Sequence, residues 1–343
     1  MQIVAVSMFR SGFSSLLVLS LANLPALADE PFQGTSKPEQ LVVVSFDGAH
    51  DNKLWEKSRA MAKRTGAHFS YFLSCTFLMT TENRKGYQAP HEKRGKSNIG
   101  FAPDNADVIT RLDQIWLARG EGHDIGSHAC GHFDGAKWSA EDWAQEFDFF
   151  RNTLRDAWQN AGVPEREPVE WRDFAEKEIA GFRAPYLSTG PGLGKALRAF
   201  GFRYDASQVS KEPALPADAD GLLHFALPLI PEGPSAKPVV AMDYNLFVRH
   251  SRASEDAANS AAYERRTLAA FRAAFEKQYS GKRIPLQLGF HFVEMNGGAY
   301  WRALDRFLTE TCAKPDVSCV SHREAIDRLA ERAKATEAAS EMN

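Results

Sequence analysis

Long runs of lysine and arginine are missing from this sequence of 343 residues, and its formal net charge is only -3. Proteins that bind nucleic acid concentrate positive charge on one face, so the composition predicts no nucleic-acid partner. No Gly-x-Gly-x-x-Gly segment follows the first apolar strand, which removes the usual sign of a dinucleotide-binding domain. The sequence also has no internal repeat, which argues against a solenoid.

Long hydrophobic runs are equally scarce, and the main one lies at the N-terminus. Arg10 precedes an apolar stretch over residues 13–27, which ends in Ala26-Leu27-Ala28. A short apolar stretch before an Ala-x-Ala site is typical of a signal peptide, here residues 1–28 with cleavage before Asp29. As a membrane anchor the stretch is too short and too often interrupted. We therefore expect an exported protein, periplasmic or extracellular, without stable membrane insertion after cleavage.

Cysteine is scarce too, with four in the whole chain. Export makes disulfides possible. Cys312 and Cys319 flank a short Lys-Pro-Asp loop, so we expect them to pair. Cys75 ends an apolar strand and Cys130 lies among histidines, and these two either pair with each other or remain buried free thiols.

Apolar and amphipathic segments alternate along the rest of the chain, which predicts an α/β fold with a mostly parallel sheet. We expect strands over residues 41–46, 68–73, 124–126, 180–184, 202–205, 239–247 and 285–291. We expect helices over residues 53–65, 106–119, 139–160, 194–200, 257–278, 300–311 and 323–335. Ser139 and Asp142 match a capping box for the third of these helices. The remaining segments are expected to be a polar leader at 29–39, irregular stretches at 80–104 and 206–238, and a polar tail at 336–343.

Residues capable of chemistry follow four of the expected strands. His128 and His132 lie four positions apart in a glycine-rich segment, and two converging neutral imidazoles are a common start of a metal site. Asp47, Arg183 and His291 each stand at the end of another strand. Barrel enzymes place their catalytic groups at the C-terminal ends of the strands, so one barrel-like domain over residues 40–335 fits better than two domains.

These segments resemble the motifs of the polysaccharide deacetylases, the NodB-homology domain of carbohydrate esterase family 4. The matches, in the order of the family, are Ser45-Phe46-Asp47-Gly48, His128-Ala129-Cys130-Gly131-His132, Arg183-Ala184-Pro185-Tyr186 and Leu288-Gly289-Phe290-His291. A further motif is less distinct, and either Asp205 or Asp243 fills it. The resemblance implies a single distorted (β/α)7-type barrel with its active site at the C-terminal ends of the strands.

The resemblance also implies a hydrolase that removes N-acetyl groups from an amino-sugar polysaccharide. In such a site two histidines and a carboxylate hold a divalent metal, usually zinc, while a carboxylate base and a histidine acid move protons. The matching residues are His128 and His132 as ligands, Asp47 as base, Arg183 as its orienting partner, the backbone of Tyr186 in the oxyanion hole and His291 as acid. The implied substrate is an N-acetylated glycan, namely a chitin oligomer, peptidoglycan or an exopolysaccharide.

The sequence departs from the family pattern at two positions. Gly48 stands where the family has a second aspartate, so Asp47 is either the base, with a substitute ligand on the metal, or itself a metal ligand. His50 and Asp51 are the nearest substitutes. Ala129 stands where the family has a serine or threonine that bonds within the histidine loop, and a disulfide at Cys130 is one way to replace that bond.

Other interpretations remain open on the sequence. The missing aspartate is compatible with a catalytically silent barrel that binds glycans. A glycoside hydrolase needs two facing carboxylates, for which Asp47 and Asp243 are the pair to consider. Tyr300 and Trp301 form either a sugar-stacking wall or plain helix core.

Overall fold

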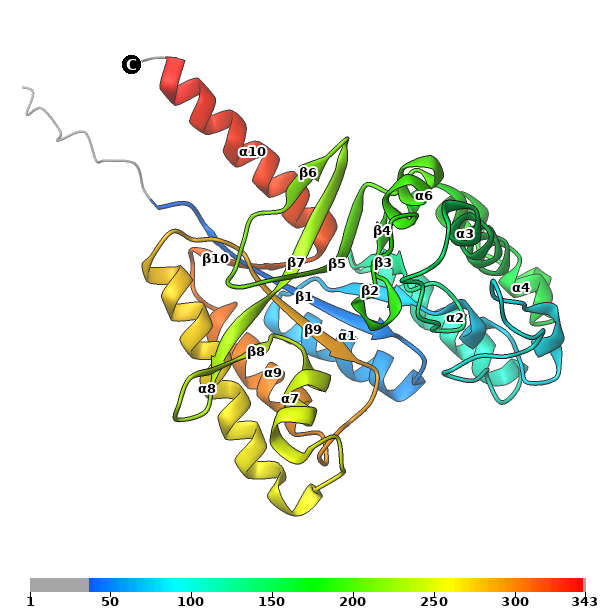
Figure 1. Cartoon of the computed structure of the whole chain (residues 1–343), viewed down its shortest axis with the longest axis horizontal. Coiled ribbons are helices and arrows are strands. Elements are labelled where there is room, and N and C mark those ends of the chain that lie inside the picture. Colours follow the sequence, from blue (N-terminus) through cyan, green and yellow to red (C-terminus); the bar gives the residue numbers. More distant parts are fainter. Residues whose placement is uncertain (1–36, 342–343) are drawn as a thin grey trace, which may run out of the picture. The chain divides into compact units, whose positions relative to one another are not determined.

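The predicted alternation of strands and helices is present in the structure, a computed structural model that describes residues 37–341 (Figure 1). The expected signal peptide and most of the polar leader lie outside these residues. The strands of this part of the chain are β1 (Gln40–Gly48), β2 (Ser70–Leu73), β3 (Asp124–Ser127), β4 (Gly181–Phe182), β5 (Tyr204–Ser210), β6 (Ala217–Ala219), β7 (Leu222–Glu232), β8 (Lys237–Val240), β9 (Leu286–His291) and β10 (Val317–Val320). The helices are α1 (Asn52–Thr65), α2 (Asn105–Gly120), α3 (Ala140–Arg155), α4 (Ala157–Asn160), α5 (Trp171–Asp173), α6 (Leu193–Phe200), α7 (Asp243–Ser251), α8 (Ser260–Ser280), α9 (Ala299–Thr311) and α10 (His322–Glu341).

Parallel pairing curls the sheet into a barrel. The strands β1, β2, β3, β4, β5 and β7 are successive parallel neighbours, and β9 pairs in parallel with the free edge of β1. Ala241 and Met242 join β7 to β9, because the Ala241 N–H donates to the Pro228 carbonyl at 2.9 Å and the Gly289 N–H donates to the Ala241 carbonyl at 2.8 Å. Met242 also forms a parallel bridge with Gly289. The α/β class and the distorted (β/α)7-type barrel that the sequence predicts are therefore confirmed.

The side chains of β1 explain how the barrel presents a polar residue at one end. Successive residues of a strand point to opposite faces, and Leu41 and Val43 lie in the smaller apolar cluster with Phe72, Tyr204 and Phe225. Val42, Val44 and Phe46 lie instead in the larger cluster, which includes the apolar faces of the helices. Ser45 and Asp47 continue the alternation of Leu41 and Val43, so Asp47 faces inward where β1 ends.

Local signals fix the helix starts that the sequence identifies. Asp51 caps α1, because its carboxylate accepts hydrogen bonds from the N–H groups of Lys53 and Leu54. Ser139 and Asp142 form the predicted capping box of α3. The predicted single helix over 139–160 is interrupted at Asp156, where the backbone leaves helical geometry between α3 and α4.

Two predictions about the second half of the chain are wrong. Residues 239–247 are not a strand, because β8 ends at Val240 and α7 begins at Asp243. Residues 206–238 are not irregular, because they contain the end of β5 and all of β6 and β7, which pair with one another. In addition, the short strand β10 was not predicted, and the helix expected over residues 323–335 extends to Glu341 as α10.

Both disulfides are formed. Cys312 pairs with Cys319, as predicted, and Cys75 pairs with Cys130, which settles the alternative of two free thiols. The helices of the described segment include none with the length and apolar character that crossing a membrane requires.

Candidate active site

A pocket of about 210 Å³ lies where β1, β3 and β9 end. Because parallel strands end at the same side of a barrel, side chains from distant parts of the sequence meet there. Four residues that the sequence singles out line this pocket together, namely Asp47, His128, His132 and His291. The other lining residues are Gly48, His50, Phe77, Ile99, Phe292 and Val293.

Arg183 holds the carboxylate of Asp47 in its charged form. The Arg183 side chain is 0% exposed, and its Nη1 donates to Asp47 Oδ1 at 2.9 Å and to Ser45 Oγ at 2.7 Å. Its Nε donates to the carbonyl of Ala206, which fixes the plane of the guanidinium. Burial by itself raises the pKa of Asp47, but Arg183, His128 and His291 outweigh this effect and lower the pKa. Asp47 is therefore an ionised carboxylate at neutral pH.

His128 and His132 are two neutral imidazoles in contact. Their ring centroids lie 5.1 Å apart, and His128 Nδ1 lies 2.7 Å from the carbonyl oxygen of Arg183. That carbonyl can only accept, so Nδ1 carries the proton and Nε2 keeps its lone pair. Burial lowers the pKa of His128, and burial together with His128 and His291 lowers the pKa of His132 to about 3.

The loop between the two histidines has a demanding backbone. Ala129 and His132 both have positive φ values, of 57° and 55°. Such conformations persist where the surroundings over-determine them. Gly131 has no room for a side chain, because a Cβ would approach the Tyr87 ring to 2.7 Å.

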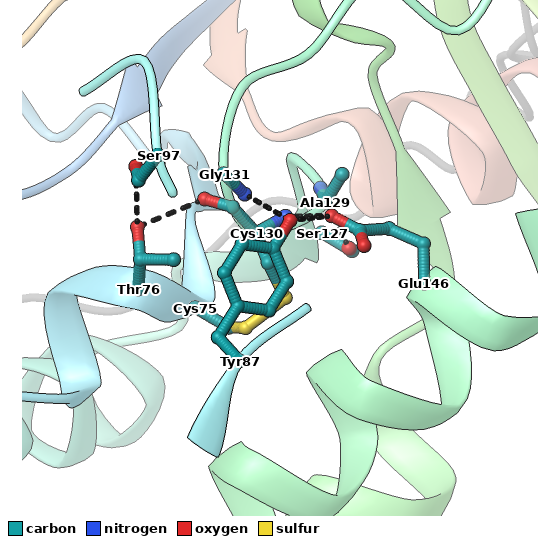
Figure 2. The surroundings of a disulfide bond; sticks show 9 residues. All are labelled: Cys75, Thr76, Tyr87, Ser97, Ser127, Ala129, Cys130, Gly131 and Glu146. Carbon is teal, nitrogen blue, oxygen red and sulfur yellow. Dashed lines mark hydrogen bonds between the residues drawn. A yellow bond between two sulfur atoms is a disulfide. The ribbon is translucent and has the colours of Figure 1, made fainter. Parts of the chain in front are cut away.

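A disulfide and a buried carboxyl group supply the constraint on this loop (Figure 2). Cys130 is bonded to Cys75, and its N–H donates to Glu146 Oε1 at 2.9 Å. The Tyr87 hydroxyl donates to the same oxygen at 2.8 Å and accepts from the Gly131 N–H at 2.9 Å. Figure 2 shows these groups gathered around the loop, which is therefore tied down at both residues that separate Ala129 from His132.

Asp243 orients and charges His291. Asp243 is 0% exposed, its Oδ1 lies 2.7 Å from His291 Nδ1, and its Oδ2 accepts from the His291 N–H at 2.8 Å. Burial by itself lowers the pKa of His291, but Asp243 outweighs this effect and raises the pKa. Of the two aspartates that the sequence left open, Asp243 contacts the site, whereas Asp205 pairs with His224 elsewhere. Because both oxygens of Asp243 are occupied, it does not support a glycoside hydrolase.

Tyr186 lies beside the pocket rather than in its lining. It belongs to a 3-10 turn over Pro185–Leu187, and its own φ is 58°. The Leu187 and Ser188 N–H groups donate to the Ala184 and Pro185 carbonyls. Because Pro185 has no N–H, the Tyr186 N–H is the first amide of the turn. Tyr186 is 60% exposed as a residue, and its ring packs edge-on against His132, with ring centroids 4.5 Å apart.

The pocket also contains His50, which the sequence offers as a substitute for the missing aspartate, and two residues that sequence reasoning missed, Phe77 and Ile99. His50 stacks on Phe77, with ring centroids 4.8 Å apart, and Ile99 comes from the expected irregular insert. No motif marks Phe77 or Ile99. Tyr300 and Trp301 are core residues, at 1% and 0% exposure, and not a sugar-stacking wall.

The donor groups fit a metal ion incompletely. His128 and His132 offer neutral nitrogen lone pairs beside the ionised Asp47, which is the donor chemistry that zinc prefers. Within residues 37–341, however, no group of three or more histidine, cysteine, aspartate or glutamate side chains is gathered closely enough to hold a metal ion. Gly48 has no side chain to donate, and the Asp51 carboxylate is used as the cap of α1.

No protein-family model and no curated protein sequence matches this chain. Solved structures do match it. A protein from Mycobacterium smegmatis assigned as a polysaccharide deacetylase is 17% identical, with a TM-score of 0.50 over 88% of this chain and 92% of that one. One from Pseudomonas aeruginosa with a similar assignment is 14% identical, with a TM-score of 0.48 over 84% and 90% of the two chains. A peptidoglycan deacetylase from Bacillus subtilis is 10% identical, with a TM-score of 0.47 over 90% and 100%.

The similarity to the Mycobacterium smegmatis protein extends over nearly the whole described chain and is one of fold. The motifs that carry the resemblance in the sequence lie at the ends of β1, β3, β4 and β9 in this fold. The chain therefore has the NodB-homology barrel fold of the polysaccharide deacetylases.

Proposed function

We propose that this protein is an exported hydrolase that removes N-acetyl groups from an amino-sugar polysaccharide. One observation carries the proposal: Asp47 and His291 line the same pocket, and their surroundings move their pKa values in opposite directions. Two titratable groups whose pKa values are pushed apart form an acid and base pair. Cleavage of an amide needs one group to take a proton from water and another to give a proton to the leaving amine.

The roles follow from the contacts of each residue. Asp47, held ionised by Arg183, accepts a proton from the water that attacks the acetyl carbonyl carbon. The Tyr186 N–H donates a hydrogen bond to the oxygen that becomes negative. His291, whose protonated form Asp243 stabilises, gives its proton to the sugar nitrogen as the carbon–nitrogen bond breaks. The products are acetate and a free amine.

Metal binding belongs to this proposal. His128 and His132 would offer two nitrogen ligands to a divalent ion, zinc first, while Asp47 keeps its role as base; such an ion would supply Lewis-acid chemistry to the water and the carbonyl oxygen. The loop around Cys130 keeps both imidazoles in place, and the Arg183 carbonyl keeps the lone pair of His128 Nε2 available.

The compartment is also part of the proposal. Two disulfides support an oxidising environment, as does the expected signal peptide. A periplasmic or extracellular location brings the protein to chitin oligomers, peptidoglycan or exopolysaccharides, which are the substrates to test.

The test is release of acetate by the protein that begins at Asp29, with added zinc or cobalt. The substrates are chitin hexamer, peptidoglycan fragments and a small acetyl ester. We expect Asp47→Asn and His291→Ala to lower kcat/KM by about 100-fold or more. His224→Gln is the matched control, because His224 also pairs with a buried aspartate but does not line the pocket. Absence of acetate release from every substrate contradicts the proposal.

A second candidate rests on Gly48 and on the incomplete donor group. If the wild type binds chitin hexamer without turnover, and Gly48→Asp gains turnover, the protein is a catalytically silent glycan-binding barrel. Turnover by the wild type excludes this candidate.

A further inference from the structure

A second groove, of about 470 Å³, lies outside the active pocket. It is bounded by the segment after β2, the start of α2 and the helices α3 and α4. Its size is within the range of sites that bind small organic molecules. Asparagines line it at four points that are distant in the sequence, namely Asn83, Asn105, Asn152 and Asn160. The chain has only 11 asparagines, so this is a concentration of one chemical group in one place.

The amides of these four asparagines are available to a ligand. Within residues 37–341 none of the four side chains makes a hydrogen bond to another residue. Of the five other asparagines in residues 37–341, Asn52, Asn98, Asn259 and Asn296 bond to protein atoms through their side chains, and Asn245 does not. An amide offers both a donor and an acceptor, so four free amides match a ligand that also carries both.

The groove is electrically neutral. Asp156 is its only lining residue with a charged side chain, and that carboxylate is paired with Arg155 at 2.6 Å and with Arg172 at 3.3 Å. The Phe149 ring and Met79 add apolar surface. Neutral groups that both donate and accept, next to apolar C–H surface, are the features of a sugar ring, whereas phosphates and nucleic acids need unpaired cations.

We propose that this groove is a second glycan-binding site, which takes a neutral, hydroxyl-rich sugar unit. It is separate from the active pocket, yet one short segment joins the two, because Phe77 lines the pocket and Leu78 and Met79 line the groove. The groove and the pocket therefore adjoin the same segment of the chain. The binding step does not depend on the proposed hydrolase activity.

The test compares glycan binding by the full protein with and without Asn105→Ala/Asn152→Ala. Both proteins carry Asp47→Asn to prevent turnover, and chitin hexamer and cellohexaose are titrated by calorimetry. We expect the double variant to lose one binding site per chain, or to bind about 10-fold more weakly, because several hydrogen bonds disappear. With Asp47 restored, the double variant should hydrolyse a small acetyl ester at the wild-type rate.

The matched control is Asn259→Ala, since Asn259 is an exposed asparagine that does not line the groove. Unchanged binding of both hexamers by the double variant overturns the proposal, and so does an equal loss in the control. If Asn105→Ala/Asn152→Ala lowers the melting temperature, Asn83→Ala/Asn160→Ala takes its place. The proposal then requires the same loss of binding in this second variant. The two proposals can fail separately. If the wild type releases no acetate but the double variant still loses glycan binding, the proposed hydrolase is refuted and the proposed groove is supported.

Discussion

Asp243 sets the charge of His291, because both of its oxygens bond to that residue and its own side chain is fully buried. The raised pKa keeps the imidazole protonated to higher pH than the ordinary value of 6.5, and the acid form is lost as pH rises through the raised pKa. In Asp243→Asn, burial, the largest influence, and Arg183 lower the pKa of His291, and only Asp47 still raises it. We expect the basic limb of the pH profile of kcat/KM to move down by about 1–3 pH units. A limb that stays in place, or one that moves equally in His224→Gln, contradicts this role.

Gly48 is a position where one side chain changes the donor set. It has a φ of 85°, and a Cβ added there meets no atom within 4 Å. Gly48→Asp should therefore add a carboxylate beside Asp47 and tighten zinc binding by about 10- to 100-fold. The left-handed backbone should lower the free energy of unfolding by about 1–2 kcal/mol. Competition with a chromophoric chelator and urea unfolding measure the two effects. Gly48→Asn is the control, because it has the same backbone strain without the charge and should not tighten zinc binding.

At the scale of elements, the histidine loop depends on the Cys75–Cys130 disulfide. Cys75→Ser/Cys130→Ser should lower kcat/KM by about 10-fold or more, because the positive-φ backbone of the loop loses its main constraint. The bridged residues are 55 positions apart, so loss of the bond should cost about 4 kcal/mol of stability. Removal of the Cys312–Cys319 bond, which spans 7 positions, should cost about 2 kcal/mol and leave kcat/KM unchanged. Equal activity losses in the two variants would falsify the positioning role.

Glu146 makes the stability of this loop depend on pH. Burial raises the pKa of Glu146 from 4.5 to about 7. The contribution of its neutral form to stability is complete below pH 4.5 and is lost as pH rises through about 7. Glu146→Gln keeps an oxygen for the Cys130 N–H but cannot ionise. It should match the wild type at pH 4 and exceed it at pH 8 by up to about 3 kcal/mol in urea unfolding. Tyr87→Phe retains the Glu146 carboxyl group, so its stability should still fall as pH rises through about 7.

The sequence predicts elements best where a local signal defines them. Asp51 and Ser139 mark the starts of α1 and α3, and the continuous apolar runs of β1 and β9 mark buried strands. Residues 239–247 misled because a short apolar run does not separate a strand from a buried helix. The start of α7 has no side-chain cap at Met242, so its position depends on tertiary contacts.

The prolines of β7 and β8 misled for another reason. Proline has no N–H to donate, which argues against a strand. Pro231 and Pro238 face each other in the antiparallel pair, so neither occupies a position that needs a donor. The site was predictable where motifs mark it, as at Asp47 and His128. The sequence left open whether Asp205 or Asp243 belongs to the site. The contact between Asp243 and His291 decides it, and that contact is visible only in the structure.

At the scale of the whole molecule, the barrel is closed along one narrow seam between β7 and β9. A Cβ at Gly289 would lie 2.9 Å from Met242 Cε and 3.4 Å from Leu227 Cδ1. Gly289→Val should therefore lower stability by about 1–3 kcal/mol, as measured by urea unfolding, and should lower activity more than this loss of folded protein explains. Gly120→Ala, at a position with open space, should change neither. Parallel losses of stability and activity in Gly289→Val would mean that the seam only supports the fold.

The two residues that close this seam are followed directly by Asp243. Completion of the ring of strands and placement of the carboxylate beside His291 therefore depend on the same short segment. Without this segment the contact between Asp47 and Arg183 would remain, but His291 would lose the carboxylate that orients its imidazole. One short segment thus serves both the closure of the barrel and the acid of the proposed mechanism.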